Sequence, residues 1–181
     1  MSIMEELFAA NENFCAQEPP ACKTVCSSRP TRHFAVLTCM DTRLVEFLEP
    51  ALGIQRGEAK ILKNAGNCVT GMFDSMVQSL LICVFQMGVQ EVFVIGHDSC
   101  GMEKTTSGEL MEKMLQRGIA PEAIAMVRDE LSHWTDRFES AEKNVVRTVQ
   151  VLSHHPLLPG DIQIHGLMFH PQTGRLRHVI A

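Results

Sequence analysis

The sequence predicts an α/β fold: a mainly parallel β-sheet flanked by helices, with a C-terminal antiparallel strand. Short apolar runs that resemble strands alternate with longer segments whose apolar residues recur at helical spacing. Such alternation is typical of parallel sheets, because two parallel strands are joined by a crossover that is usually helical. The segment between the last two strand-like runs, at 171–174, has the composition of a hairpin turn. The final strand is therefore expected to run antiparallel.

The N-terminal third predicts one helix, a linker, a strand and a short helix. Residues 2–17 mix apolar and acidic side chains at helical spacing, whereas the prolines and serines of 18–30 favour an irregular linker. The apolar run at 33–38 is expected to form the first strand. A short helix over 44–52 follows and ends at Gly53.

The middle of the chain predicts a second strand, a long helix and a third strand. The second strand is expected at 59–63 and leads into a turn-like segment at 64–67. Residues 72–87 carry apolar side chains at positions i, i+3, i+4 and i+7, and Gly88 follows them. This pattern predicts an amphipathic helix. The third strand is expected at 91–95.

The C-terminal part predicts three helices and then two strands. The helices are expected at 105–116, 121–134 and 140–152, and proline at position 121 suits the first turn of a helix. The strands are expected at 161–169 and 176–180.

Length and composition are those of one globular domain. The chain has 181 residues, of which 45% are hydrophobic and 20% charged. We expect residues 1–32 to form an N-terminal helix and linker arm, and residues 33–181 to form a single α/β domain. The formal net charge is −5 and no stretch concentrates lysine or arginine, so neither a nucleic acid nor an anionic membrane is expected as a partner.

The expected location is cytoplasmic. The N-terminus lacks the basic segment and continuous apolar core of a signal peptide. No apolar run approaches the ~20 residues that span a bilayer.

Seven cysteines are many for a chain with these features. Without a secretory signal they are more typical of metal binding, catalysis or core packing than of disulfides. Cys83 lies in an apolar helical segment and is expected to be a small buried side chain. Cys15, Cys22 and Cys26 have spacings unlike those of zinc sites and are interpreted as free thiols. Cys68 falls in a loop, and the sequence assigns it no role.

Two short clusters that contain cysteine follow directly after predicted strands. Cys39 follows the first strand, and His97 and Cys100 follow the third. Because the carboxyl ends of parallel strands lie along one edge of a sheet, neighbouring strands would bring these three side chains together. Two thiolates and one imidazole leave the fourth position of a tetrahedral zinc ion open, as in catalytic zinc sites. The sequence therefore predicts a zinc enzyme that activates water.

Asp41 and Arg43 are placed to assist that chemistry. In an extended or turning segment, residues i, i+2 and i+4 share one side, so both could face the same pocket as Cys39. An arginine beside a carboxylate keeps it ionised and orients it as a hydrogen-bond acceptor. An ordinary surface ion pair is the alternative, and such pairs contribute only ~0–1 kcal/mol.

These motifs, taken in order, resemble those of the β-class carbonic anhydrases, and most closely the small prokaryotic branch of that family. The resemblance covers most of the chain from Phe34 onward. Its motifs are Cys39-x-Asp41-x-Arg43, Asn64-Ala65-Gly66 and His97-x-x-Cys100-Gly101.

The resemblance implies that Cys39, His97 and Cys100 bind zinc and that Asp41 and Arg43 form a catalytic dyad. The implied reaction is reversible hydration of CO2 to bicarbonate and a proton by zinc-bound hydroxide. It also implies a homodimer or a larger homo-oligomer, with residues 33–181 as the zinc-binding catalytic domain. Three small residues are assigned to the substrate pocket. They are Ala65, Gly66 and Gly101.

The sequence is compatible with three alternatives. Asp41 could itself occupy the fourth zinc position, which would give an inactive state. The same scaffold could hydrolyse carbonyl sulfide or carbon disulfide, which are linear like CO2, or the chain could be a non-catalytic zinc-stabilised binding dimer. Two positions depart from the family pattern: Lys63 stands where arginine is common, and Asp98 where a small hydroxyl residue is usual.

Several other residues have ordinary structural interpretations. His154 and His155 lie at the end of a predicted helix, where helix capping or exposure is the usual role. The methionines on predicted helices are expected to fill gaps in the core or in an interface. They are Met72, Met76, Met87, Met111, Met114 and Met126.

Overall fold

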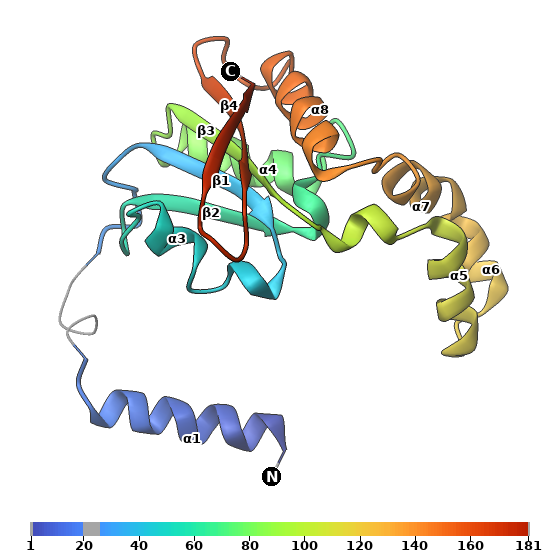
Figure 1. The fold of residues 1–181 in the computed structure, drawn as a ribbon, viewed down its shortest axis with the longest axis horizontal. Coiled ribbons are helices and arrows are strands. Elements are labelled where there is room, and N and C mark those ends of the chain that lie inside the picture. The colour runs from blue at the N-terminus through green and yellow to red at the C-terminus, as the bar shows by residue number, and fades with distance from the viewer. Residues whose placement is uncertain (1, 20–25, 181) are drawn as a thin grey trace.

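Five strands form one sheet in the order β2-β1-β3-β4-β5. The computed structural model describes residues 2–19 and 26–180. Neighbouring strands are parallel except for β5, which runs antiparallel to β4. The predicted fold class is therefore confirmed (Figure 1). The strands are β1 (Phe34–Cys39), β2 (Ala59–Asn64), β3 (Glu91–His97), β4 (Gln163–Phe169) and β5 (Leu176–Ile180).

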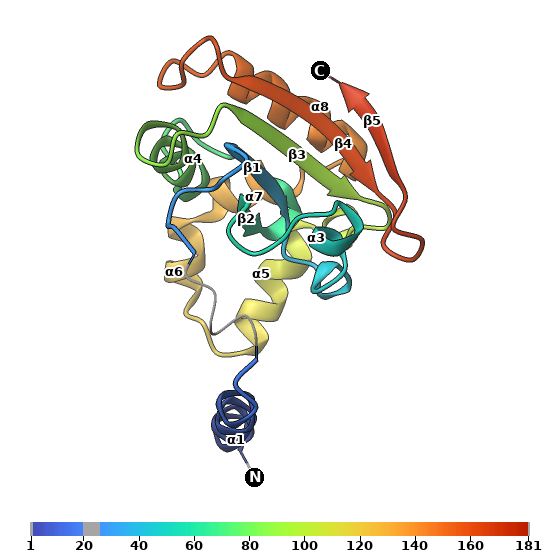
Figure 2. The same ribbon diagram turned by 90° about the vertical axis from the view of Figure 1, so that its left-hand side faces the viewer.

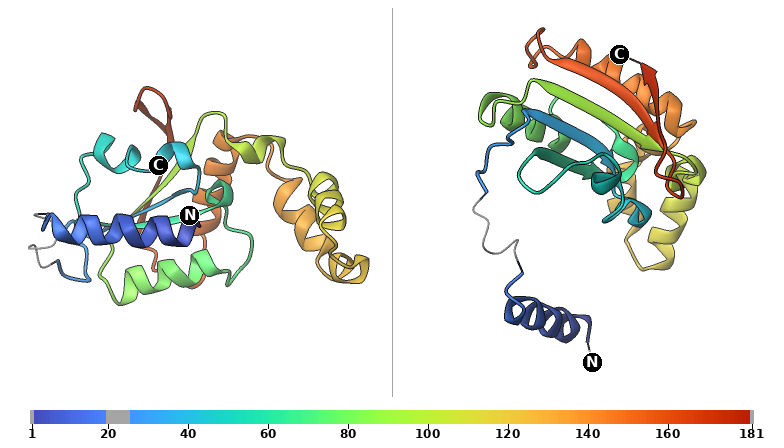
Figure 3. Two further views of the ribbon diagram at one scale, coloured as in Figure 1. Left: turned by 90° about the horizontal axis from the view of Figure 1, so that it is seen from below. Right: turned by 60° about the vertical axis from the view of Figure 1, so that its left-hand side comes forward.

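Helices cover both faces of this sheet. The α-helices are α1 (Ile3–Ala16), α3 (Leu48–Ala51), α4 (Ser75–Phe85), α5 (Ser107–Gln116), α6 (Pro121–Met126), α7 (Arg128–Thr135) and α8 (Ala141–Ser153). Three single turns of 3₁₀ helix are η1 (Thr42–Leu44), η2 (Ala65–Asn67) and η3 (Gly101–Lys104). α8 packs along β3 and β4 (Figure 2), while α5, α6 and α7 project from one end of the sheet (Figures 1 and 3).

Three helix predictions need correction, each for a local reason. The helix expected over 44–52 is split into η1 and α3, because Val45 is extended and Glu46 has a positive φ of 54°. The helix expected over 121–134 is interrupted at Val127, whose φ of −119° and ψ of 11° leave the helical region. α4 begins later than predicted because Asp74 caps it, its carboxylate accepting from the backbone N–H groups of Met76 and Val77.

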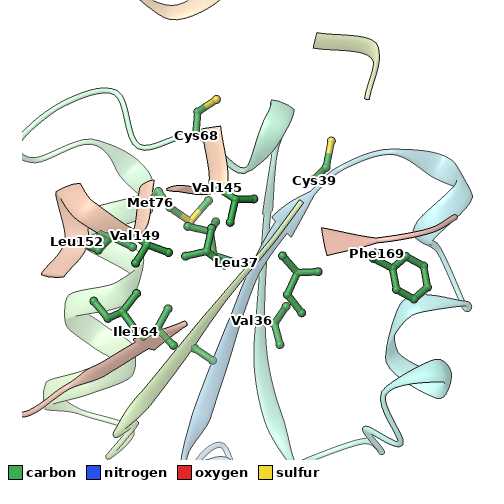
Figure 4. Packing of buried hydrophobic residues seen from close by; sticks show 14 of the residues in the cluster. Val36, Leu37, Cys39, Cys68, Met76, Val145, Val149, Leu152, Ile164 and Phe169 are labelled. Carbon is green, nitrogen blue, oxygen red and sulfur yellow. The ribbon is translucent and has the colours of Figure 1, made fainter. Parts of the chain in front are cut away.

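The core lies on both sides of the central strands. Figure 4 shows Met76, Val145 and Val149 packed together on one side of the sheet and Phe169 on the other. On that second side, the ring of Phe47 at the start of α3 meets the ring of Phe169 edge-on, with centroids 5.5 Å apart. Cys83 is buried as predicted.

Two of these methionines do not pack in the core of the single chain, and whether they lie in an interface stays a prediction. Met76 is buried, but Met72 and Met126 have 63% and 82% of their surfaces exposed. Met72 lies before the Asp74 cap of α4 and is therefore not on a helix, and Met126 ends the short helix α6.

Glycine at position 166 in β4 allows α8 to pack closely on the sheet. A Cβ atom there would lie 2.7 Å from a methyl carbon of Ile180 and 2.9 Å from one of Val145. We expect Gly166→Ala to lower the free energy of unfolding by about 1–3 kcal/mol, because overpacking forces the helix away from the sheet. Urea denaturation measures this change. Gly160→Ala is the matched control, since open space surrounds Gly160; equal stability of both variants would contradict this view of the packing.

The N-terminal helix α1 lies apart from the sheet (Figures 1 and 3), and none of its residues is buried. Ser2 and Glu5 cap its start reciprocally, each side chain bonding the backbone N–H of the other. Its apolar side chains Ile3, Leu7 and Phe8 are each more than half exposed. The division into an arm of residues 1–32 and a domain of residues 33–181 stays a prediction. None of the helices in the described residues combines the length and apolar character that a membrane span requires.

Candidate metal centre

Three potential metal ligands meet at the carboxyl ends of β1 and β3. Cys39 is the last residue of β1, His97 is the last residue of β3, and Cys100 precedes η3. The parallel register aligns the two strands, with Thr38 opposite Ile95, so both chains leave the sheet at the same edge. The two Sγ atoms and a ring nitrogen of His97 lie within 4.8 Å of one another, and all three residues are buried. The structure thus brings together the three residues that the sequence predicted as zinc ligands.

The imidazole of His97 is oriented for ligation. Its Nδ1 lies 3.1 Å from the carbonyl oxygen of Asp98, which fixes the proton on Nδ1 and leaves a lone pair on Nε2. That Nε2 atom is fully buried and has no hydrogen-bond partner among the described residues. A buried polar atom without a partner is costly, at about 1–3 kcal/mol. A metal ion bound to Nε2 removes this cost, so the histidine fits a metal site better than a packing role.

A sulfur–sulfur hydrogen bond couples the two cysteines and favours the thiolate form of Cys39. Their Sγ atoms lie 3.9 Å apart. The Cys100 thiol lowers the pKa of Cys39 by donating to it, and the same contact raises the pKa of Cys100. Zinc binds cysteine as the thiolate, so a divalent cation bound here would displace the proton from the Cys100 thiol.

The η2 turn supports Cys39 from behind. The backbone N–H of Gly66 donates to the Sγ atom of Cys39 at 3.4 Å. Gly66 has a positive φ of 74°, and a Cβ atom there would lie only 2.7 Å from the ring of Phe138. Glycine is therefore required at this position. The side chain of Asn144 in α8 donates to the carbonyl oxygen of Gly66 at 2.7 Å and holds the turn in place.

Asp41 and Arg43 form a two-point ion pair beside the three ligands. Arg43 donates from Nε to Oδ1 at 2.9 Å and from Nη2 to Oδ2 at 2.8 Å. Its Nη2 also donates to the carbonyl oxygen of Ser99, which ties η1 to the loop after β3. The Oδ2 atom of Asp41 lies 3.7 Å from Nε2 of His97. Hydrogen bonds from Arg43 lower the pKa of Asp41 to about 2, so this carboxylate stays ionised through the neutral range.

Two of the three residues assigned to the substrate pocket lie beside Cys39, and the third is exposed. Ala65 and Gly66 lie in η2, next to Cys39, whereas Gly101 is exposed and its Cα faces open space. Their assignment to the substrate pocket stays a prediction. Lys63, which departs from the family pattern, forms an ion pair with Glu49 at 2.8 Å.

Sequence reasoning missed two supporting residues. Asn144 lies within α8, far along the chain from any cysteine motif, and Ser99 contributes only its carbonyl oxygen. A positive φ of 56° at Ser99 turns the chain there, but no side-chain pattern in the sequence indicates this conformation.

Comparison with known proteins agrees with this geometry. The family model for carbonic anhydrase matches residues 34–176. The chain belongs to the β-carbonic anhydrase family. The crystal structure of β-carbonic anhydrase isoform I from Trichomonas vaginalis is similar over 99% of this chain and 98% of that one, with a TM-score of 0.95 and 41% identity.

Curated relatives of this β-carbonic anhydrase family member carry two kinds of name. YtiB of Bacillus subtilis, a candidate carbonic anhydrase by name, is 38% identical over 99% of this chain and 97% of its own length. A carbon disulfide hydrolase from an Acidianus strain is 31% identical over 81% of this chain and 76% of its own. The family is therefore established, and the choice of substrate has to be argued from the site.

Proposed function

We propose that this protein catalyses the reversible hydration of CO2 to bicarbonate and a proton, with zinc held by Cys39, His97 and Cys100. The observation that supports this most directly is the buried His97 Nε2 atom, which has no partner among the described residues and faces two cysteine sulfurs. Two sulfurs and one nitrogen are a favoured donor set for zinc, and three protein ligands leave one coordination position free. When bound there, zinc supplies the Lewis acidity that makes a water molecule nucleophilic near neutral pH.

The dyad explains how the chain would direct that water. Two thiolates cancel the formal charge of Zn²⁺, so they acidify a water molecule less than three neutral imidazoles do. Neighbouring groups must then assist. Asp41 is held ionised by Arg43 and lies on the His97 side of the site, where its carboxylate can accept a hydrogen bond from the water and orient it.

The same pairing favours a free fourth coordination position. Both carboxylate oxygens of Asp41 accept from Arg43. Ligation of zinc by Asp41 would weaken at least one of these charge-assisted bonds, which are roughly twice as strong as neutral ones. We therefore propose that Asp41 orients the substrate water and is not itself a zinc ligand.

Hydrolysis of carbon disulfide is the second candidate, because a carbon disulfide hydrolase is 31% identical to this chain. CO2 and carbon disulfide are both linear and attacked at carbon, so one site could serve either. The homodimer and the cytoplasmic location stay predictions from the sequence.

Stopped-flow kinetics on protein with verified zinc content tests the assignment. We expect CO2 hydration, followed with a pH indicator, to speed up from mildly acidic to alkaline pH, and we expect no sulfide release from carbon disulfide. Sulfide release without CO2 hydration would favour the second candidate. Neither reaction, at about one zinc per chain, would leave a binding role.

A further inference from the structure

One pocket is lined by none of the three candidate metal ligands. It opens between the segment after η2, helix α7 and the C-terminal end of α8. Its wall includes the side chains of Arg137, Arg147, His133, His154 and Trp134, and no aspartate or glutamate lines it. The pocket is therefore locally cationic in a chain whose formal net charge is −5.

The two arginines are not neutralised by carboxylates. Within the part of the chain that the structure describes, neither Arg137 nor Arg147 forms an ion pair. Glu139 is influenced by the charge of Arg147, but it pairs with Lys143 and does not line the pocket. Arg147 is a partly buried residue, and a bound anion would supply the counter-charge that it lacks among the described residues.

Donor groups remain available on both guanidinium groups. Arg147 donates to the carbonyl oxygen of Arg137 at 3.1 Å and to the side-chain oxygen of Asn144 at 2.9 Å, which are two of its five N–H groups. Arg137 lies 3.4 Å from Nε2 of His133, which must accept because a guanidinium can only donate. The remaining N–H groups have the planar geometry that matches a carboxylate or phosphate.

His155 forms part of the pocket wall. His155 is buried, contrary to the expectation of capping or exposure. Its Nε2 lies 2.9 Å from the carbonyl oxygen of Met72, and its Nδ1 accepts from the backbone N–H of Leu157. Both ring nitrogens thus have hydrogen-bond partners, and His155 contributes shape to the pocket wall.

We propose that this pocket binds a small oxyanion, a phosphate or carboxylate group, between Arg137 and Arg147 and beside the ring of Trp134.

A series of hydrogen bonds also connects the pocket to the candidate metal centre. Arg147 bonds Asn144, Asn144 bonds the carbonyl oxygen of Gly66, and the N–H of Gly66 bonds Cys39. An anion that draws Arg147 toward itself acts on the first bond of this series. The effect on Cys39 rests on the metal role proposed above, whereas the binding site itself does not.

Fluorescence of Trp134 provides the test, because this is the only tryptophan in the sequence. Metal-free and zinc-loaded protein are titrated with inorganic phosphate and, separately, with acetate, at ionic strength held constant with chloride. We expect a saturable change in emission for at least one of them. The stronger ligand identifies the group as phosphate or carboxylate. Because the metal-free protein is included, this result is independent of CO2 hydration.

Substitutions locate the site. We expect Arg137→Gln and Arg147→Gln each to weaken binding at least tenfold, whereas Arg117→Gln, an exposed arginine outside the pocket, leaves it unchanged. Arg137 is itself exposed, so its variant is expected to fold even if the Arg147 variant does not. A linear, unsaturable response to both anions, or equal affinity in wild type and Arg137→Gln, would overturn the proposal.

The connection to Cys39 has its own measurement. In protein loaded with Co²⁺, we expect saturating oxyanion to shift the sulfur-to-cobalt charge-transfer band, and Arg137→Gln to abolish that shift. A shift that persists in Arg137→Gln would place the anion at the metal itself and overturn the connection.

Discussion

Asp41→Asn is expected to reduce CO2 hydration by about 10²–10⁴-fold while zinc remains bound at wild-type stoichiometry. The asparagine side chain has nearly the same shape, but it carries no charge and presents only one acceptor oxygen. It can no longer pair with Arg43 at two points or accept reliably from the attacking water. Stopped-flow kinetics and metal analysis on the same preparation measure the two quantities.

Asp161→Asn serves as the matched control, because Asp161 is an exposed aspartate in the loop before β4. Its turnover and zinc content are expected to equal those of the wild type. Unchanged turnover in Asp41→Asn would remove Asp41 from the mechanism. Loss of zinc together with turnover would instead make Asp41 a metal ligand.

Cys100→Ala is expected to abolish stoichiometric zinc binding and with it CO2 hydration. Cys100 supplies one of the three side-chain donors that meet among the described residues, and alanine supplies none. Because zinc binds the folded state, excess zinc should raise the melting temperature of the wild type by about 5–10 °C. The variant should show no such rise. Elemental analysis after gel filtration and thermal denaturation with and without zinc measure both effects.

Cys83→Ala is the control for losing a buried cysteine. Cys83 packs in α4 and is not part of the metal-ligand group. This variant is expected to lose some stability through the cavity it leaves, yet to retain zinc and its stabilising effect. If Cys100→Ala kept one zinc per chain, the ligand assignment would be wrong.

The strands and the meeting of the three candidate metal ligands were predictable because both depend on short segments of sequence. Short apolar runs define β1 and β3. The placement of Cys39 and His97 follows from where those runs end, since parallel strands finish at a common edge. The hairpin turn likewise identified β5 as antiparallel.

Other features depend on contacts between distant segments and were therefore not predictable. The bond between Asn144 and Gly66 joins residues 78 positions apart, and the bond from Arg43 to Ser99 joins residues 56 apart. The burial of His155 similarly requires the carbonyl oxygen of Met72, 83 positions away. The predicted helix boundaries were wrong where a single residue, such as Val127, adopts non-helical backbone angles. A hydrophobic pattern carries no information about the backbone angles of one residue.

The pairing of β3 with β4 has a consequence for how the protein acquires its metal during synthesis. All three ligands precede Gly101 in the chain, yet His97 pairs with Phe169 at the end of β4, and the N–H of Asp98 donates to the carbonyl oxygen of Phe169. The ribosome thus releases all three candidate ligands well before it makes the strand that pairs with the backbone of His97. A nascent chain that ends before β4 has the ligands without their geometry. With the metal role proposed above, high-affinity metal uptake would therefore require β4 to have docked beside β3.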